Sequence, residues 1–275
     1  MPPKSPFETI ETYHHESDDR ILHVDLNRPE EKNVITPQAV ADIDDALRAA
    51  DRDETVGGII LGTSGEDFCA GGSLEDIKDM DRQQGNRFLN AYIDMVHLLR
   101  ETGKPTIAAI EGLCVAGGNE IVMGSDVIVA GESARFGQPE VRVGSTAAAG
   151  GVQMLPLLVG EQRAKDLLLT GRLLSAEEAE DWGLINRVVP DGTATERATE
   201  IIQEILDESS PQAYRVIKSV MKKWNNLAMA EREMARELTT ATWDSEEFKD
   251  RAESFLDNGS MRSREFSGTL GDLDD

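Results

Sequence analysis

A glutamate that follows a glycine-rich turn is the first group in this sequence whose type and position suit acid–base chemistry. Residues 106–110 form a β-branched and alanine run that predicts a buried strand, and residues 112–118 are too rich in glycine to continue it. We therefore expect a helix to begin near Gly117. The first amides of a helix have no partner inside it, so the Gly117 N–H can face a developing oxyanion. Glu120 lies one turn along on the same helix face and can look into the same pocket.

A second glutamate, Glu140, follows 20 residues after Glu120, behind a predicted strand at 126–130. Its loop contains Pro139, which keeps the preceding residue extended and suits a fixed carboxylate. Two carboxylates beside an amide donor suit addition or elimination at a polarised acyl group, because one can deliver a proton while the other takes one from water. The plainer interpretation is that both are solvated residues in a chain with 52 acidic side chains, and spacing alone does not exclude it.

Another glycine-rich loop, at 66–73, follows a predicted strand at 59–62 and can supply a second amide from Gly72. With this loop, the chain resembles the crotonase superfamily and is most similar to the enoyl-CoA hydratases. The matching segments come in the order and spacing of that family and are highly specific together, although each alone is weak. They are Leu26-Asn-Arg-Pro29, Phe68-Cys-Ala-Gly-Gly72, Ala116-Gly-Gly-Asn-Glu120, Ala134-Arg-Phe-Gly-Gln-Pro-Glu140 and Ala149-Gly-Gly151.

The resemblance implies the chemistry of the hydratases. In that family the amides at the positions of Gly72 and Gly117 form the oxyanion hole for a thioester carbonyl, and one such donor contributes about 3 to 4 kcal/mol to transition-state stabilisation. The resemblance assigns to Glu120 the orientation and deprotonation of the water that attacks Cβ, and to Glu140 the delivery of a proton to Cα. It implies hydration of a 2-enoyl-CoA to a 3-hydroxyacyl-CoA, with coenzyme A as part of the substrate and with no separate cofactor or metal.

The resemblance also implies where the substrate binds. Contacts with coenzyme A and the substrate are expected at Arg28, Ala70, Gly72, Ser73, Leu74 and Lys218. Lys218 belongs to an island of positive charge in an acidic protein, which suits a phosphate. Ser73 stands where the family usually has aspartate. Ala147 and Ala148 replace a common Pro-Gly pair, so we expect their methyl groups to line the acyl pocket and to influence substrate preference.

Other functions stay open at this point. The same site can serve double-bond isomerisation, hydrolysis of a thioester or a ring, or the ring closure of dihydroxynaphthoyl-CoA synthases. Residues 143–145 are similar to those synthases, but the synthases generally lack the glutamate at the position of Glu140. A different class is an acyl-CoA-binding protein without turnover. The presence of both glutamates favours hydration.

The composition limits the class of protein. A chain of 275 residues with 39% hydrophobic residues can bury a sizeable core. It has no apolar run near the roughly 20 residues of a membrane helix, and its first residues lack the apolar core of a signal peptide, so we expect a soluble, cytoplasmic protein. The formal net charge of −24 argues against binding to nucleic acid or membranes. It also suggests adaptation to salt, with an ordinary acidic enzyme as the alternative.

The elements predict an α/β fold, which the resemblance specifies as a crotonase-like spiral of ββα units. We divide the chain into a core with the CoA-thioester site at 1–192, a C-terminal helical region for oligomerisation at 193–267, and an acidic tail at 268–275 that we expect to be disordered. The resemblance implies a homo-trimer or a dimer of trimers. Besides the strands named above, we expect strands at 7–13, 21–26 and 184–189, and a turn at His14-His15. Helices are expected at 37–50, 74–80, 83–100, 153–170 with a break near Pro156, 176–182, 193–208, 211–224, 227–242 and 245–257.

Overall fold

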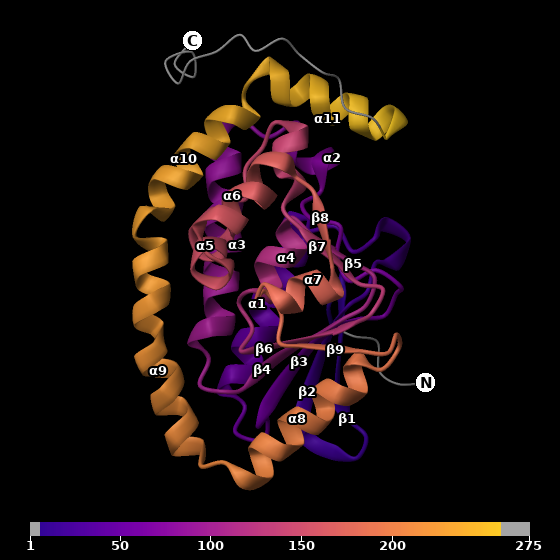
Figure 1. Cartoon of the computed structure of the whole chain (residues 1–275), viewed down its shortest axis with the longest axis vertical. Helices are drawn as coiled ribbons and strands as arrows, with labels where there is room; N and C mark the ends of the chain where they lie inside the picture. Colours follow the sequence, from indigo (N-terminus) through magenta and orange to yellow (C-terminus); the bar gives the residue numbers. More distant parts are fainter. Residues whose placement is uncertain (1–5, 260–275) are drawn as a thin grey trace.

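The structure is a computed structural model that describes residues 6–259, and its centre is a six-stranded sheet (Figure 1). The strand order is β1-β2-β3-β4-β6-β9, in which β1 and β2 are antiparallel and all other neighbours are parallel. The strands are β1 (Ile10–His15), β2 (Asp18–Leu26), β3 (Gly58–Thr63), β4 (Thr106–Ile110), β6 (Val127–Gly131) and β9 (Arg187–Val189). The central strands β3 and β4 are buried almost throughout, because helices cover both faces of the sheet.

A smaller sheet lies beside the large one and explains the repeating architecture. Its strands are β5 (Leu113–Val115), β7 (Arg135–Gly137) and β8 (Leu173–Ser175) in the order β5-β7-β8. The chain passes from β4 through β5 into α4 (Gly117–Val122), and from β6 through β7 into α5 (Gly151–Val159). An isolated parallel β-bridge, formed by the backbones of Cys69 and Cys114, brings the segment after β3 against β5 in the same way. Both cysteines are free thiols. This repetition is the predicted spiral of ββα units, and the α/β prediction is confirmed.

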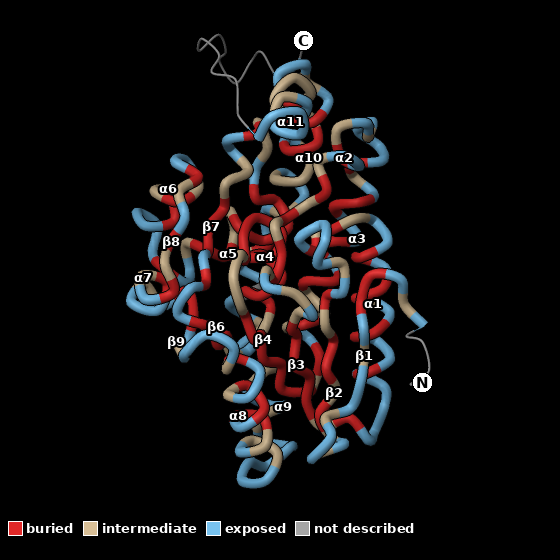
Figure 2. Tube along the Cα trace, turned by 90° about the vertical axis from the view of Figure 1, so that its right-hand side faces the viewer, coloured by how far each residue is buried: buried red, intermediate tan, exposed pale blue. Residues whose placement is uncertain are grey.

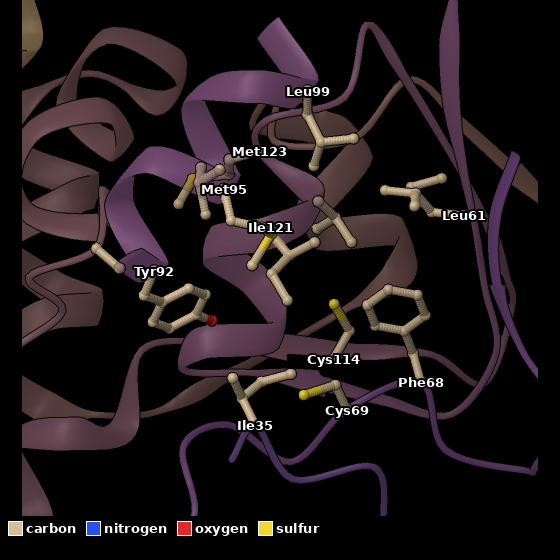
Figure 3. Packing of buried hydrophobic residues seen from close by; sticks show 14 of the residues in the cluster. Ile35, Leu61, Phe68, Cys69, Tyr92, Met95, Leu99, Cys114, Ile121 and Met123 are labelled. Carbon is tan, nitrogen blue, oxygen red and sulfur yellow. The ribbon is translucent and has the colours of Figure 1, made fainter. Parts of the chain in front are cut away.

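Helices close the two faces of the large sheet. On one face α8 (Ala194–Glu208) packs its alanines and isoleucines against Ile60, Ile107 and Val129. On the other face α1 (Pro37–Arg52), α3 (Arg82–Glu101) and α4 enclose the main core with Leu61 and Ile110. Figure 2 shows the buried residues gathered in the central strands and in these helices, and Figure 3 shows side chains at the centre of this core. Side chains of α3 and α4 therefore belong to the same core.

The C-terminal helices run along the outside of the molecule (Figure 1). They are α9 (Pro211–Ala228), α10 (Arg232–Trp243) and α11 (Glu246–Asn258). Helix α10 packs on α3, and Trp243 contacts Phe88 and Phe248, with ring centroids 6.4 and 6.1 Å apart. The remaining helices are α2 (Leu74–Ile77), α6 (Glu161–Thr170), α7 (Ala176–Asp181) and 3-10 turns at Pro29–Glu31, Pro139–Val143 and Met229–Glu231.

Several expected boundaries are wrong. The turn expected at His14-His15 lies at residues 16–17 instead, because both histidines belong to β1 and pair with β2. The helix does not break near Pro156, which lies inside α5; it ends at Gly160, whose φ of +85° is incompatible with a helix. Only the end of the strand expected at 184–189 is a strand. The three strands of the smaller sheet, β5, β7 and β8, were not expected, because three-residue strands arise from long-range pairing that local patterns do not reveal.

Three further expectations concern the C-terminal tail, membrane helices and the division of the chain at 192. The predicted acidic tail at 268–275 lies outside the described residues. Within residues 6–259, every helix is too short or too polar to cross a membrane. The division at 192 coincides with the change from strands and helices to helices alone, because α8 begins at Ala194 and no described strand follows β9.

Candidate active site

One cavity of about 560 Å³ brings together the residues for which the sequence predicted chemistry. It lies between α3, α4 and the C-terminal helices, and its wall includes Gly72, Gly117, Glu120 and Glu140. A larger groove between α1 and α3 shares only Phe88 with this cavity and contains none of the predicted site residues. The chemistry is therefore expected in the smaller cavity.

Two backbone amides in the cavity wall are free to bind a ligand. Among the described residues, neither the Gly72 N–H nor the Gly117 N–H donates to a protein acceptor. An isolated β-bridge between the backbones of Gly72 and Ile35 holds the Gly72 amide in place. The Gly117 amide follows Ala116, whose φ of +50° and ψ of −126° turn the chain sharply from β5 into α4. Such a conformation is costly for alanine, and residues of this kind gather at functional sites.

Glu120 is a buried carboxylate fixed by the backbone. Its Oε1 accepts a hydrogen bond of 2.9 Å from the Gly151 N–H, at the start of α5. Burial raises the pKa of Glu120 from 4.5 to about 7, although backbone donors at residues 149–151 oppose the shift. A Cβ on Gly151 would approach Ala147 far too closely and would lie 3.2 Å from Oε1 of Glu120, so glycine is needed for this contact. Glu120 can therefore exchange a proton near neutral pH.

Glu140 lies opposite, on the 3-10 turn Pro139–Val143, and is half-buried in the cavity wall. In the amide orientation that satisfies both of its polar atoms, Gln138 donates through its nitrogen to Glu140 at 2.9 Å and accepts through its oxygen from Asn119 at 3.2 Å. Burial and then the charge of Glu120 raise the pKa of Glu140 well above 4.5. Because each carboxylate disfavours ionisation of the other, the pair retains a proton when one member is ionised.

The other predicted residues divide into those that line the cavity and those that do not. Ala70, Leu74 and Ala148 line it. Ala147 is buried behind the wall, against Gly151. Ser73 lies next to the wall as the N-cap of α2, where its hydroxyl accepts from the Asp76 N–H at 3.3 Å.

The two predicted cationic contacts are also separate from the wall. The Arg28 guanidinium forms an ion pair with Glu31, a residue at the cavity edge, where Lys32 also lies. Lys218 is not brought to the cavity by this chain. Its ammonium binds Asp126 at 2.6 Å and the Lys104 carbonyl at 2.8 Å. It therefore joins α9 to the segments that directly precede β4 and β6.

Sequence reasoning missed several residues of the site. Trp243, Phe248, Phe255 and Leu256 from α10 and α11 line the cavity, and none of them was predicted as a site residue. Gln138 lies within a matching segment, so the sequence contained a signal for it. Tyr92 lines the cavity as well, but on a helix its spacing is that of any core residue. The described residues contain no group of three or more His, Cys, Asp or Glu that could hold a metal ion.

Comparison with known proteins adds sequence evidence. Residues 16–264 match the sequence model of the enoyl-CoA hydratase/isomerase family. A probable enoyl-CoA hydratase from Rhizobium meliloti (strain 1021) is 35% identical over 223 residues, which cover 81% of this chain and 86% of that protein. The mevalonyl-coenzyme A hydratase sidH from Aspergillus fumigatus is 38% identical over 197 residues, which cover 71% of this chain and 72% of that protein.

Solved structures are similar over nearly the whole chain. An enoyl-CoA hydratase/isomerase from Xanthobacter autotrophicus Py2 has a TM-score of 0.83 at 26% identity, with 92% of this chain and 94% of that chain covered. EchA1_1 from Mycobacterium paratuberculosis has a TM-score of 0.78 at 30% identity, with 90% and 95% covered. The likeness thus includes both the sheet core and most of the C-terminal helices.

Proposed function

Because the chain belongs to the enoyl-CoA hydratase/isomerase family, we propose that it is an enoyl-CoA hydratase, which adds water across the 2,3 double bond of a 2-enoyl-CoA. The product is a 3-hydroxyacyl-CoA. The observation that carries the proposal is one cavity with two unpaired amides and two carboxylates whose pKa values are raised. No resident cofactor is needed, since coenzyme A is part of the substrate, and we keep the cytoplasm as the proposed location.

The proposed mechanism begins at the thioester carbonyl. Its oxygen accepts from the N–H groups of Gly72 and Gly117, which draws electron density from Cβ and prepares it for attack. Ionised Glu120 takes a proton from water as the water oxygen bonds to Cβ, and protonated Glu140 gives its proton to Cα. One proton and one hydroxyl are added in total, and the two carboxyl groups exchange proton states. A proton moved between them through solvent resets the site.

The substrate-binding residues follow from the same cavity. We propose that coenzyme A enters past Ala70, Leu74 and Lys32, which lie at or near the Gly72 loop. The acyl chain then extends along an apolar wall that includes Ala148 and Trp243. Most of the wall is hydrocarbon, which favours an acyl group over a polar substrate.

Isomerisation is the second candidate, and part of the family name refers to it. Moving a double bond requires a proton to leave one carbon and reach another, for which one carboxylate suffices. Hydration requires one group to activate water and another to protonate Cα, so the paired carboxylates favour it. An acyl-CoA-binding protein without turnover would have no need for two raised pKa values in one cavity.

The test supplies crotonyl-CoA and, separately, a 3-enoyl-CoA to the purified protein. We expect loss of the enoyl absorbance of crotonyl-CoA and formation of 3-hydroxybutanoyl-CoA, identified by mass and by uptake of ¹⁸O from labelled water. Conversion of the 3-enoyl-CoA without hydration of crotonyl-CoA would instead identify an isomerase. Binding of both thioesters with no product would identify a binding protein.

A further inference from the structure

A buried hydroxyl in the cavity wall has no hydrogen-bond partner among the residues that the structure describes. Tyr92 on α3 is 3% exposed, and its hydroxyl forms no hydrogen bond with any described residue. Other hydroxyls of the wall are paired: Ser145 accepts from the Trp243 indole at 2.7 Å, and Thr146 bonds Thr239 at 2.5 Å. Unpaired buried polar groups destabilise a fold, so a retained one needs a reason.

The hydroxyl lies beside one of the two free amides. Figure 3 shows Tyr92 reaching from α3 toward the helix that carries Ile121, which is α4. A Cβ on Gly117 would lie less than 3.0 Å from the Tyr92 hydroxyl and 3.2 Å from its ring carbon Cζ. This side chain therefore requires glycine at position 117, where the hydroxyl occupies the space of a methyl group.

The separation allows both donors to share one acceptor. A Cβ lies roughly 2.5 Å from its own backbone nitrogen, so the Tyr92 hydroxyl is within roughly 5.5 Å of the Gly117 nitrogen. Hydrogen-bonded heavy atoms are about 2.9 Å apart, so a single oxygen between the two can accept from each. The atom that the proposed function puts against the Gly117 amide is the thioester oxygen.

We propose that the Tyr92 hydroxyl is a third donor to the thioester oxygen of the bound acyl-CoA, in addition to the amides of Gly72 and Gly117. The inference rests on the proposed function, since it requires an acyl thioester in the cavity. As water attacks Cβ, negative charge develops on this oxygen and a third donor stabilises it. Tyr92 keeps its proton throughout, so no covalent bond to it changes.

The protonation state of Tyr92 agrees with a donor. Burial, followed by the charge of Glu120, raises the pKa of Tyr92 well above 10.0, so the phenol stays neutral over the working range of an enzyme. A neutral phenol offers its O–H to an oxygen and does not compete with the glutamates as a base. Among the described contacts, neither carboxylate takes this hydrogen bond.

The test measures the carbonyl stretch of bound butanoyl-CoA, labelled with ¹³C at the thioester carbon, by infrared difference spectroscopy. We expect the native protein to lower the frequency relative to free butanoyl-CoA, and Tyr92→Phe to lower it less. Tyr92→Phe is also expected to reduce kcat for crotonyl-CoA on the order of 100-fold with little change in KM. The matched control is Tyr13→Phe. Tyr13 lies on β1, and its hydroxyl donates to Asp25 at 2.9 Å. This variant should behave as the native protein.

The outcomes separate this inference from the proposed function. If Tyr92→Phe lowers the carbonyl frequency as much as the native protein does and keeps the native kcat, the inference is overturned and hydration is left intact. If the native protein leaves the carbonyl frequency of bound butanoyl-CoA unchanged but hydrates crotonyl-CoA, the inference alone is overturned. If it also forms no 3-hydroxybutanoyl-CoA, the proposed function is overturned as well. If Tyr92→Phe does not fold, 3-fluorotyrosine at position 92 replaces it. This more acidic phenol is a stronger donor and should lower the frequency further, and an unchanged frequency would overturn the inference.

Discussion

Glu120 and Glu140 are identical side chains whose surroundings give them different tasks. Glu120 is buried, but the Gly151 N–H stabilises its ionised form, and its pKa is about 7. Glu140 is half-buried in the same cavity wall, where desolvation and then the charge of Glu120 raise its pKa well above 4.5. Since the Gly151 N–H stabilises the ionised form of Glu120, we propose that Glu120 is the ionised member of the pair near neutral pH and that Glu140 holds the proton. This is the state that hydration requires of a base and an acid in one cavity.

The pH dependence of kcat/KM follows from the raised pKa values of Glu120 and Glu140. Below pH 7 Glu120 gains a proton and can no longer activate water, so kcat/KM should fall as the pH decreases through about 7. At higher pH Glu140 loses its proton and cannot protonate Cα, so kcat/KM should fall again. Initial rates with crotonyl-CoA from pH 5 to 10, with circular dichroism at each pH as a control for folding, measure the profile. Rates that stay constant between pH 5 and 8 would contradict it.

At the scale of elements, the turn between β4 and β5 packs against the loop that leads to Gly72, one of the two proposed oxyanion donors. Gly112 has a φ of +58°, and a Cβ there would collide with the Glu66 carbonyl and lie 2.7 Å from Oδ1 of Asp67. Asp67 accepts from the Leu113 N–H at 2.9 Å, which ties the loop before Gly72 to β5. Since β5 leads into α4, this contact couples the two amides.

A matched pair of glycine substitutions tests this role. Gly192 also has a positive φ, of +80°, but its Cβ would meet no atom within 4 Å. Gly192→Ala should therefore cost only the strain of the left-handed backbone, about 1 to 2 kcal/mol. Gly112→Ala should cost at least about 1 to 3 kcal/mol more, because the carbonyl and carboxylate must move. Urea unfolding compares the free energies of unfolding, and equal losses in the two variants would show that the turn is not tightly packed.

The sequence predicted the site better than it predicted the small elements. The glycine motifs and the two glutamates lie in segments whose local chemistry is distinctive, and the fold brings Gly72, Gly117, Glu120 and Glu140 to one cavity. The contact of α10 and α11 with the cavity depends on how distant helices pack, which no local pattern encodes. The phosphate contact expected at Lys218 stays a prediction, since within this chain its ammonium binds Asp126.

At the scale of the whole molecule, the outer side of α9 is unusually apolar. Its large exposed side chains are Val216, Ile217, Val220, Met221, Trp224 and Leu227. Trp224 is 62% exposed in the single chain, and a stripe of this kind on one helix is typical of an interface. We propose that this face of α9 is buried between copies of the chain in the trimer, or dimer of trimers, that the family resemblance implies.

A charge placed within this stripe should prevent assembly. Val220 is 68% exposed, so Val220→Glu should leave the single chain folded but place an unpaired charge in the interface. Size-exclusion chromatography with light scattering should then give the mass of one chain, 30.1 kDa, where the native protein gives a multiple of it. Ala49→Glu, on the exposed side of α1, is the control and should keep the native mass. A native-size assembly of Val220→Glu would exclude this face.

The formal net charge of −24 gives a prediction for the stability of the whole chain. Self-repulsion of exposed carboxylates is strongest at low salt, and at molar salt the screening length falls to about 3 Å. The melting temperature should therefore rise between low and molar KCl. Sorbitol at matched osmolality serves as the control, because it strengthens burial without screening charge. An unchanged melting temperature in KCl would refute the proposal of salt adaptation.

The most direct test of the central claim compares Glu120→Gln, Glu140→Gln and the double variant in the hydration of crotonyl-CoA. Glutamine keeps the shape of the side chain and removes the carboxylate, and a positioned acid or base contributes about 10² to 10⁴-fold to the rate. We predict that each single variant loses at least about 10²-fold in kcat, and that the double variant loses little more, because the two groups act as a unit. Native kcat in either single variant, or losses that multiply in the double variant, would contradict the paired mechanism.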